Sequence, residues 1–453
     1  MHGGAAGLAC REQPLPVTVP AGTHRQNFAL EPNPLRLGEV VVTGEGTSTT
    51  RERLGNVINT VDTTLVSRSN ETNIVSALAG KAPNVEVTSS SGDPGSSSYI
   101  RIRGPKTITG TGQPLFVVDG VPIDNSTNST ENNPLGGTTA PNRASDINPD
   151  DIASVEILKG AAAGAIYGAR AGQGVVLITT KRGQSGATRY SLRTNYSFDD
   201  VTHKIPLQTK FAHGAGGVTP SCDASNPDGL PVDSLLDCGP STSESWGPPV
   251  APGTPIFNHF DELFQTGHQW NSTLSISGGN DRTLYYVSAS RDNDNGAIVG
   301  PNDWYDKTTA HLNASHRVFE GLNVGMDVSY VSNRGHFLQQ GSNIDGLLLG
   351  ALRTPPEFDN TVFLDPTTRL HRSYRYPFPS VSSQLNTRGY DNPFFSIYDN
   401  LSQSQLNRTF GNLNVSWDPL DWLNLKETFG ADYYADERLE GLPMWNEFMF
   451  PPC

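Results

Sequence analysis

The chain has 453 residues and a formal net charge of -14, and hydrophobic residues make up 35% of it. The acidic balance and the absence of a block rich in Lys and Arg argue against a nucleic-acid-binding protein, because such proteins neutralise phosphates with basic patches. No apolar run approaches the roughly 20 residues of a membrane-spanning helix, whereas a transmembrane strand of about 10 residues needs only alternate apolar positions and is compatible with this composition.

The N-terminal region is predicted to contain β-structure followed by a tether. Its first residues, MHGGAAGLAC, lack the basic and apolar stretches of a secretory signal peptide, so we expect the native start to lie elsewhere. Residues 17–42 have the pattern of strand, turn and strand, and residues 45–56 are polar and rich in Gly and Thr. We divide the chain into a β-domain remnant (1–37), an extended segment with its tether (38–46), a compact α+β domain (47–186) and a β-rich part (187–453).

Helix and turn signals follow one another in the compact domain. The string SNETNIVSALAG predicts a short helix that is capped by Asn70 or Thr72 and ended by Gly80. LFVVDGVPID predicts two strands joined by a tight turn at Asp119 and Gly120, because Asp-Gly readily adopts the positive φ angles of such turns. NPDDIASVEILKG predicts a capped turn and a further strand.

The string YIRIRG alternates strictly and predicts a strand with two unlike faces. Ile100 and Ile102 fall on one face, and Arg101 and Arg103 fall on the other.

The glycine-rich string GARAGQG does not predict a phosphate-binding loop. Such a loop follows a strand and precedes a helix, whereas here a small-residue helix precedes the glycines and the apolar strand VVLITT follows them. We therefore interpret Gly168, Gly172 and Gly174 as residues of a tight turn.

After residue 187 the sequence alternates between apolar and polar residues over long stretches. The first such stretch, ATRYSLRTNYSFD, is repeated in LNVGMDVSY and GNLNVSWD, with weaker copies at 271–279, 282–291, 306–317 and 422–435. The chain ends at MFPPC with no closing element, so we expect this part to be incomplete. The apolar face of the first stretch consists of Tyr190, Leu192, Thr194, Tyr196 and Phe198.

Alternation also occurs in soluble β-sandwiches, so a soluble β domain is the alternative to a membrane barrel. Three details favour the barrel. The polar face carries Arg, Asp and Asn together, aromatic residues gather near strand ends, and tight turns alternate with the long segments 200–265 and 334–400.

Four cysteines are spread along the chain without a Cys-x-x-Cys pair, so no zinc site is predicted. Cys222 and Cys238 bracket a loop rich in Pro, Asp, Ser and Gly, and in an oxidising compartment they could form a disulfide. A loop of about 15 residues would gain roughly 3 kcal/mol in the chain-entropy model. The alternative is two free thiols.

A series of strings supports a resemblance to a known family: EVVVTG, ALAGKAPNVEVTSSSGDPG, IRIRG, PLFVVDGVPI and INPDDIASVEILKGAAAGAIYGARAGQGVVLITTKRG. In this order and spacing, residues 38–186 resemble the plug of TonB-dependent receptors and, within them, the SusC/RagA-like nutrient importers. The stretch ELFQTGHQWNSTLSISGGNDRTLYYVSASRDNDNGAIVG is similar to the first long hairpin region of that family. The N-terminal remnant is similar to the tail of a carboxypeptidase-regulatory-like domain.

The resemblance implies an α+β plug domain followed by an incomplete antiparallel transmembrane β-barrel, because transporters of this kind have about 22 strands. It implies a TonB-driven importer in the Gram-negative outer membrane, surrounded by lipid, with its plug and N-terminus facing the periplasm. The implied partners are TonB with its inner-membrane proton-driven complex, a SusD-like lipoprotein, and a glycan, oligosaccharide or peptide as cargo. We expect no cofactor, no metal and no nucleic-acid partner.

Two functional segments follow from the resemblance. The TonB box is assigned to Glu39, Val40, Val41, Val42 and Thr43, since an extended β-branched run on a tether can add as a strand to a sheet edge. The alternative is the last strand of the preceding β domain.

The arginines of the YIRIRG strand receive a role by the same resemblance. Arg101 and Arg103 are implied to clamp the plug to acidic groups on the inner barrel wall. The alternative is a solvated strand face.

Two further functions are alternatives. The first is an iron-siderophore or vitamin receptor of the same architecture, and the second is a surface adhesive or signalling β protein. An adhesin would tolerate deletion of residues 38–44, whereas an importer would lose uptake. No G-x-S-x-G or H-E-x-x-H string supports an enzyme.

Overall fold

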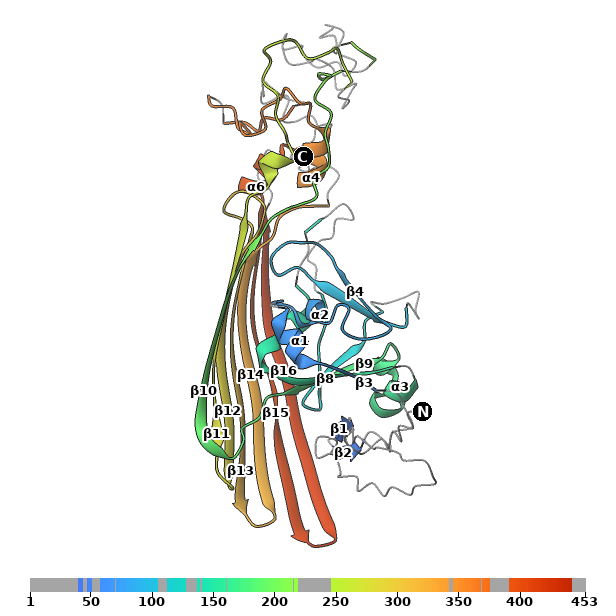
Figure 1. Ribbon diagram of the computed structural model, residues 1–453, viewed down its shortest axis with the longest axis vertical. Coiled ribbons are helices and arrows are strands. Elements are labelled where there is room, and N and C mark those ends of the chain that lie inside the picture. The colour runs from blue at the N-terminus through green and yellow to red at the C-terminus, as the bar shows by residue number, and fades with distance from the viewer. Residues whose placement is uncertain are drawn as a thin grey trace, which may run out of the picture.

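A compact unit of helices and strands lies against one face of a tall curved sheet, and long loops with short helices lie beyond one end of that sheet (Figure 1). We call the compact unit the plug and the sheet the wall. None of the helices in the described ranges is long and apolar enough to cross a membrane. The predictions for residues 1–37, Glu39, Cys222 and Cys238 lie outside the described residues. This computed structural model describes residues 40–43, 47–50, 58–69, 71–104, 112–127, 137–138, 141–159, 161–214, 216–218, 246–341, 345–367, 369–374 and 391–441.

The plug contains a five-stranded sheet in the order β3-β8-β9-β6-β7 and a separate pair, β4-β5. Only the β6–β9 pair is parallel, and the other neighbours are antiparallel. A further hairpin, β1-β2, precedes the plug. The strands are β1 (Val40–Thr43), β2 (Thr47–Thr50), β3 (Ile58–Val61), β4 (Val85–Ser89), β5 (Ser98–Ile102), β6 (Leu115–Val118), β7 (Val121–Ile123), β8 (Ile152–Leu158) and β9 (Val175–Thr180).

Short helices connect these strands. The helix predicted within SNETNIVSALAG begins later than expected, at Ile74. Its cap is Asn73, whose side chain accepts a hydrogen bond from the amide of Val75 at 2.9 Å, so the prediction of Asn70 or Thr72 as the cap was wrong. Gly80 follows the helix with a φ of 70°. The helices are α1 (Thr63–Arg68), α2 (Ile74–Ala77), η3 (Arg143–Asp146), η4 (Pro149–Asp151), α3 (Ala161–Tyr167) and η5 (Ala169–Ala171).

The turns of the plug use positive φ angles at the positions that need them. Asp119 and Gly120 join β6 to β7 with φ angles of 47° and 88°, as in a tight hairpin turn. Gly168 and Gly174 flank η5 with φ angles of 72° and 108°, whereas Gly172 has a helical φ of -57°. The glycines therefore turn the chain from α3 into the buried strand β9.

The apolar residues of the plug form one main core, to which the wall contributes. Ile100 and Ile102 of β5 are buried in it, and Arg101 between them is exposed. Arg103 lies beyond the end of β5 with a φ of 58°, so it does not continue the alternation of that strand. Val331 and Phe410 of the wall complete the same core.

The wall is a seven-stranded antiparallel sheet in which each strand pairs with the next one in the sequence. It is not closed, since β10 and β16 lie at its two edges. The predicted α+β plug followed by an incomplete antiparallel barrel is confirmed. The strands are β10 (Gly186–Asp199), β11 (Gly267–Gly279), β12 (Thr283–Asn295), β13 (Trp304–Phe319), β14 (Leu322–His336), β15 (Leu401–Leu420) and β16 (Leu423–Gly441).

The two faces of the wall have the opposite polarity to a water-soluble sheet. On the outer face, Tyr190 and Leu192 are 73% and 72% exposed. On the inner face, Ser288, Thr309 and Asp327 are buried against the plug. An apolar face that packs on nothing in the described part of the chain favours a lipid environment over a soluble sandwich.

The two long segments between wall strands pack together at one end of the wall (Figure 1). They contain η6 (Asp261–Leu263), α4 (Leu347–Arg353) and α6 (Pro393–Tyr398). Tight turns such as Gly279–Thr283 lie at the opposite end of the sheet. The two long segments and Ile298, from the connection between β12 and β13, form a small shared core of Leu263, Ile298, Leu338, Leu347, Ala351, Phe394 and Ile397.

Gly183, in the connection from the plug to the wall, is predicted to tolerate no side chain. A Cβ at this buried position would overlap the backbone nitrogen and carbonyl oxygen of Tyr285 in β12. In the intact protein, Gly183→Ala should lower the free energy of unfolding by about 1–3 kcal/mol, as overpacking does. Guanidinium unfolding followed by tryptophan fluorescence measures this change.

Gly164→Ala is the matched control. Gly164 lies in α3, and a Cβ there has nothing within 4 Å. Its stability should stay the same or rise by about 0.5–1 kcal/mol, because alanine favours a helix. Equal losses in the two variants would show that the contact with β12 is not the cause.

Candidate functional site at the seam between plug and wall

The plug segment 141–151 runs along the inner face of the wall and contacts one strand after another. Two short helical turns, η3 and η4, give it this shape, and the Asn148 side chain caps η4 by accepting from the amide of Asp150 at 3.0 Å. Together with the β6–β7 turn, residues Asp124–Ser126 and Thr180, this segment makes polar contacts with every wall strand from β10 to β16. We call this set of contacts the seam.

At one edge of the wall, Asp150 connects the plug to β10 and β11. Arg193 of β10 donates to Asp150 Oδ1 at 2.5 Å, and Thr273 of β11 donates to Asp150 Oδ2 at 2.8 Å. Arg193 also donates to the carbonyl oxygen of Ser67. One wall arginine therefore contacts two separate plug segments.

Opposite the middle of the wall, Asp151 of the plug is buried, and so is Lys307 of the wall. Tyr286 and Ser288 of β12 donate hydroxyl hydrogen bonds to Asp151 Oδ1 at 3.0 and 2.5 Å. Burial raises the pKa of Asp151, against the charge of His311 and these two hydrogen bonds.

Lys307 of β13 reaches from the wall into the plug. Its Nζ donates to the carbonyl oxygens of Thr72 and Ser145 at 2.7 and 3.2 Å, and it lies 3.4 Å from Asp292 Oδ2 of β12. All three ammonium hydrogens thus have an acceptor nearby, as a buried cation requires.

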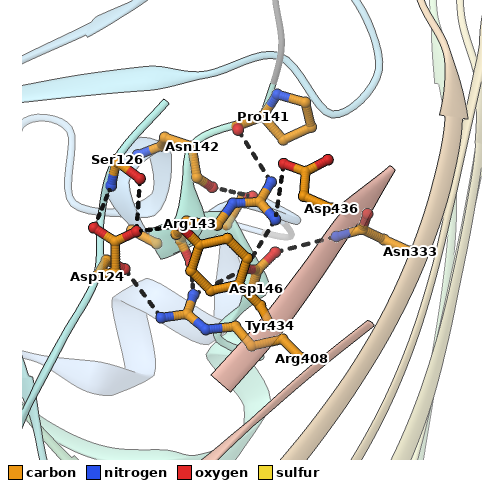
Figure 2. A network of polar contacts seen from close by, with 12 residues as sticks. Asp124, Ser126, Pro141, Asn142, Arg143, Asp146, Asn333, Arg408, Tyr434 and Asp436 are labelled. Atoms are coloured by element: carbon orange, nitrogen blue, oxygen red, sulfur yellow. Dashed lines mark hydrogen bonds and ion pairs between the residues drawn. The ribbon is translucent and has the colours of Figure 1, made fainter. Parts of the chain in front are cut away.

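Arg408 of β15 is the most fully bonded residue of the seam. Figure 2 shows it among Asp124, Asp146 and Tyr434. A guanidinium group has five N–H donors, and all five are used here. Nε and Nη2 bind both oxygens of Asp432 in β16, at 2.8 and 2.7 Å. Nη1 donates to Asp146 Oδ2 at 2.9 Å and to the Arg143 carbonyl at 2.7 Å, and Nη2 donates to the Asp124 carbonyl at 3.0 Å.

Arg408 therefore joins the wall and two segments of the plug in one buried group. Its side chain has no exposed surface, and neither has that of Asp146. Bidentate, charge-assisted hydrogen bonds of this kind are stronger than neutral ones, and they fix orientation as well as distance.

Arg143 of η3 is equally buried but less well bonded. Its Nη2 donates to the Pro141 carbonyl at 3.2 Å, and its Nη1 lies 3.6 Å from Asp146 and 3.9 Å from Asp436 of β16. Nε and Nη1 have no hydrogen-bond partner among the described residues. The ring of Tyr434 lies near both guanidinium groups, 5.9 Å from that of Arg143 and 5.8 Å from that of Arg408.

The carboxylate of Asp124 has a different environment. Burial raises its pKa, but hydrogen bonds from Ser126 and Tyr434 and the charge of Arg408 outweigh burial, so the pKa lies below its ordinary value. The Asp124 amide in turn donates to Asp432 Oδ2 at 2.9 Å.

The structure places Arg101 and Arg103 away from the seam. Both side chains are exposed, and Arg101 lies opposite Glu86 in the register of β4 and β5. The contacts that join plug to wall in the described ranges instead run mainly from donors of the wall, both cationic and neutral, to acceptors of the plug. The role of Arg101 and Arg103 as a clamp stays a prediction.

The segment that is predicted to be the TonB box forms a hairpin with the residues that follow it. Val40 to Thr43 are β1, and they pair antiparallel with β2, which lies within the stretch predicted as a flexible tether. Among the described residues no group of three or more His, Cys, Asp or Glu side chains is placed to bind a metal ion.

Comparison with known proteins agrees with this architecture. A family model described as TonB-dependent Receptor Plug Domain matches residues 50–175. The TonB-dependent receptor SusC of Bacteroides thetaiotaomicron is 27% identical over 405 residues, which cover 88% of this chain and 35% of that receptor. TonB-dependent receptor P26 of Formosa agariphila is 28% identical over 419 residues, which cover 92% of this chain and 37% of that receptor. The chain spans about a third of the length of these curated relatives.

A solved structure of the RagAB peptide importer in its "open-open" state matches with a TM-score of 0.65 at 21% identity, covering 88% of this chain and 42% of that chain. At this identity the match shows the fold. It agrees with a plug seated on the strands of a barrel wall. The plug match and the two relatives together show that residues 50–175 are the plug domain of a TonB-dependent receptor, in a chain that is similar to SusC in sequence and to the RagAB importer in fold.

Proposed function

We propose that this chain provides the gate and part of the wall of a TonB-driven importer in the Gram-negative outer membrane. The observation that supports this most is the polar seam between a plug and a wall whose outer face is apolar and exposed. Polar groups of a seam can exchange their partners for water when the plug moves. Opening such a gate hydrates the lumen, and the apolar contact that it has to break includes that of Val331 and Phe410 with the plug core.

The position of the N-terminal hairpin supports energy coupling from the periplasm. β1 and β2 lie on the side of the plug that faces the tight-turn end of the wall (Figure 1). The chain leads from β2 to β3, an edge strand of the plug sheet that pairs only with β8. A pull by TonB on Glu39 to Thr43 would thus act first on an edge of the plug.

The cargo and the second partner are proposed from the relatives. The fold match to the RagAB peptide importer supports a peptide as cargo, and the resemblance to SusC/RagA-like nutrient importers keeps a glycan or an oligosaccharide beside it. A SusD-like lipoprotein is the proposed partner at the long-loop end of the wall, where the shared core of α4, α6 and η6 offers a rigid platform.

Replacing Arg408 in the full-length protein tests the gate. Arg408→Met removes the cation that is hydrogen-bonded to Asp146 and Asp432 and leaves Asp146 with the longer ion pair to Arg143, which should cost about 3–5 kcal/mol of the cohesion between plug and wall. We expect a larger ion conductance in planar bilayers and a higher sensitivity of cells to vancomycin. Arg408→Lys, which keeps the charge but has fewer donors, should have a smaller effect.

Arg291→Lys is the matched control for this experiment. Arg291 lies on the outer side of the alternation of β12, is 55% exposed and pairs with Asp306 within the wall. Its conductance should equal that of the unchanged protein. If the conductance of Arg408→Met is as low as that of this control, the seam does not close the lumen.

Main-chain pairing with TonB is tested at Val41. Proline there removes a backbone donor, whereas alanine keeps it, so Val41→Pro should weaken binding of the TonB periplasmic domain by about tenfold or more and Val41→Ala should change it little. Surface plasmon resonance with the full-length protein measures both affinities. Normal binding by the proline variant would show that this run is not the TonB box.

A further inference from the structure

One threonine of the plug lies between two buried carboxyl groups, one on each side of the seam. Thr180, the last residue of β9, has its Oγ1 2.7 Å from Asp119 Oδ2 and 2.9 Å from Asp327 Oδ2. Asp119 belongs to the β6–β7 turn of the plug, and Asp327 belongs to β14 of the wall. The carboxyl groups are 3% and 4% exposed.

If both carboxyl groups are ionised, this site has too few hydrogens for Thr180 to form a hydrogen bond with each of them. A threonine hydroxyl has one hydrogen and can donate it to only one of the two oxygens, and an ionised carboxylate has none to give. With both groups ionised, one of these two O···O contacts would lack a hydrogen. A proton on either carboxyl group supplies it and completes the chain of hydrogen bonds from plug to wall.

The cations around the pair do not replace that proton. Arg182 Nη2 is 3.5 Å from Asp119 Oδ1, but the Arg182 side chain is 64% exposed, so water screens its charge. His311 Nε2 of β13 is 3.7 Å from Asp327 Oδ2, which is beyond hydrogen-bond distance, and His311 also lies near Asp151 of η4.

The remaining contacts are neutral donors. The Thr180 amide is 3.3 Å from both oxygens of Asp119, Asn313 of β13 donates to Asp327 Oδ2 at 2.8 Å, and Asn412 of β15 donates to the Asp119 carbonyl at 3.3 Å. Burial and then the charge of Asp327 raise the pKa of Asp119, against Thr180 and Arg182.

We propose that Asp119 and Asp327 bind one proton between them through Thr180, and that this proton is a ligand of the closed seam. While the plug is seated, the pair retains the proton; when the plug leaves, both groups meet water and ionise, since a free aspartate has a pKa of about 3.9. The seated state thus binds one proton more than the released state. Its extra stability is present at low pH and is lost as pH rises through the pKa of the seated pair.

Hydrogen exchange in the full-length protein tests this proposal without cargo or TonB. The amides of β9 and of the β6–β7 turn are followed from pH 6 to pH 9, with intrinsic exchange rates corrected for pH. Release of one proton predicts that the opening equilibrium rises by up to about tenfold per pH unit as pH approaches the pKa of the seated pair from below, and that it levels off above that pKa. Asp119→Asn and Asp327→Asn should each abolish this dependence, because an amide carries no charge.

Asp124→Asn is the matched control. The groups that contact the Asp124 carboxylate, namely the Ser126 amide, the Ser126 hydroxyl and the Tyr434 hydroxyl, are all donors, so it needs no proton of its own. This variant should keep the pH dependence. The His311→Gln variant should keep the pH dependence as well. If the pH dependence is lost in this variant, the proton belongs to the imidazole and the proposal is overturned.

Infrared spectroscopy gives a second measurement that does not depend on plug motion. The difference spectrum between pH 6 and pH 9 should contain the carbonyl band of a protonated carboxylic acid, and the band should be smaller in both Asn variants at positions 119 and 327. Burial raises the pKa of Asp303 to about 7, so part of the band remains in the variants, and a band of equal size in all three proteins contradicts the proposal. A pH-independent opening in the unchanged protein, or a spectrum without this band, contradicts the proposal. The part of this inference that concerns gating rests on the proposed function. Neither measurement depends on transport, so a negative result here would not contradict the importer assignment. That assignment is tested separately by the Arg408 and Val41 variants.

Discussion

The structure depends on one requirement: the polar groups buried between plug and wall must all find partners. The wall turns its apolar side chains outward, so its inner face is lined by Ser, Thr, Asn, Asp, Lys and Arg, which the plug then covers. A buried charge without a partner costs several kcal/mol, and only a plug with matching acceptors can be seated there. The acceptors come mainly from carboxylates and backbone carbonyls of the segment 141–151, whose two short helical turns expose them in series.

The two buried arginines of the seam illustrate how this requirement is met unevenly. Arg408 uses every donor it has, whereas Arg143 has only long ion pairs and one weak hydrogen bond in the described ranges. Both share Asp146, and Asp436, the other acidic neighbour of Arg143, is already bound by Arg438 through two hydrogen bonds. The wall therefore contributes the firmly fixed cation, and the plug contributes the one with unused donors.

Much of the fold followed from the sequence because alternation with a period of two specifies both a strand and its faces. Tyr190 and Leu192 were expected on the apolar face, and they are exposed on the outside of the wall. The site was harder to predict. Arg408 contacts Asp146 across 262 positions of sequence, and no local pattern encodes such a pairing. Arg101 and Arg103 stand out in the sequence because the string YIRIRG alternates, but they lie outside the seam. The acidic string NPDD, which contains Asp150 and Asp151, predicts only a turn.

The core of the plug contains two wall residues, Val331 and Phe410, and this affects how the protein is made. Translation delivers the plug long before β14 and β15 exist, so the newly made plug lacks part of its own interior. Contacts that span hundreds of positions form late, because a long loop must close before they contribute. Until then the plug exposes apolar surface that invites aggregation, and a chaperone would have to protect it during export. The order of folding thus differs from the order of synthesis: the plug is made before the wall but is completed only when β14 and β15 are in place.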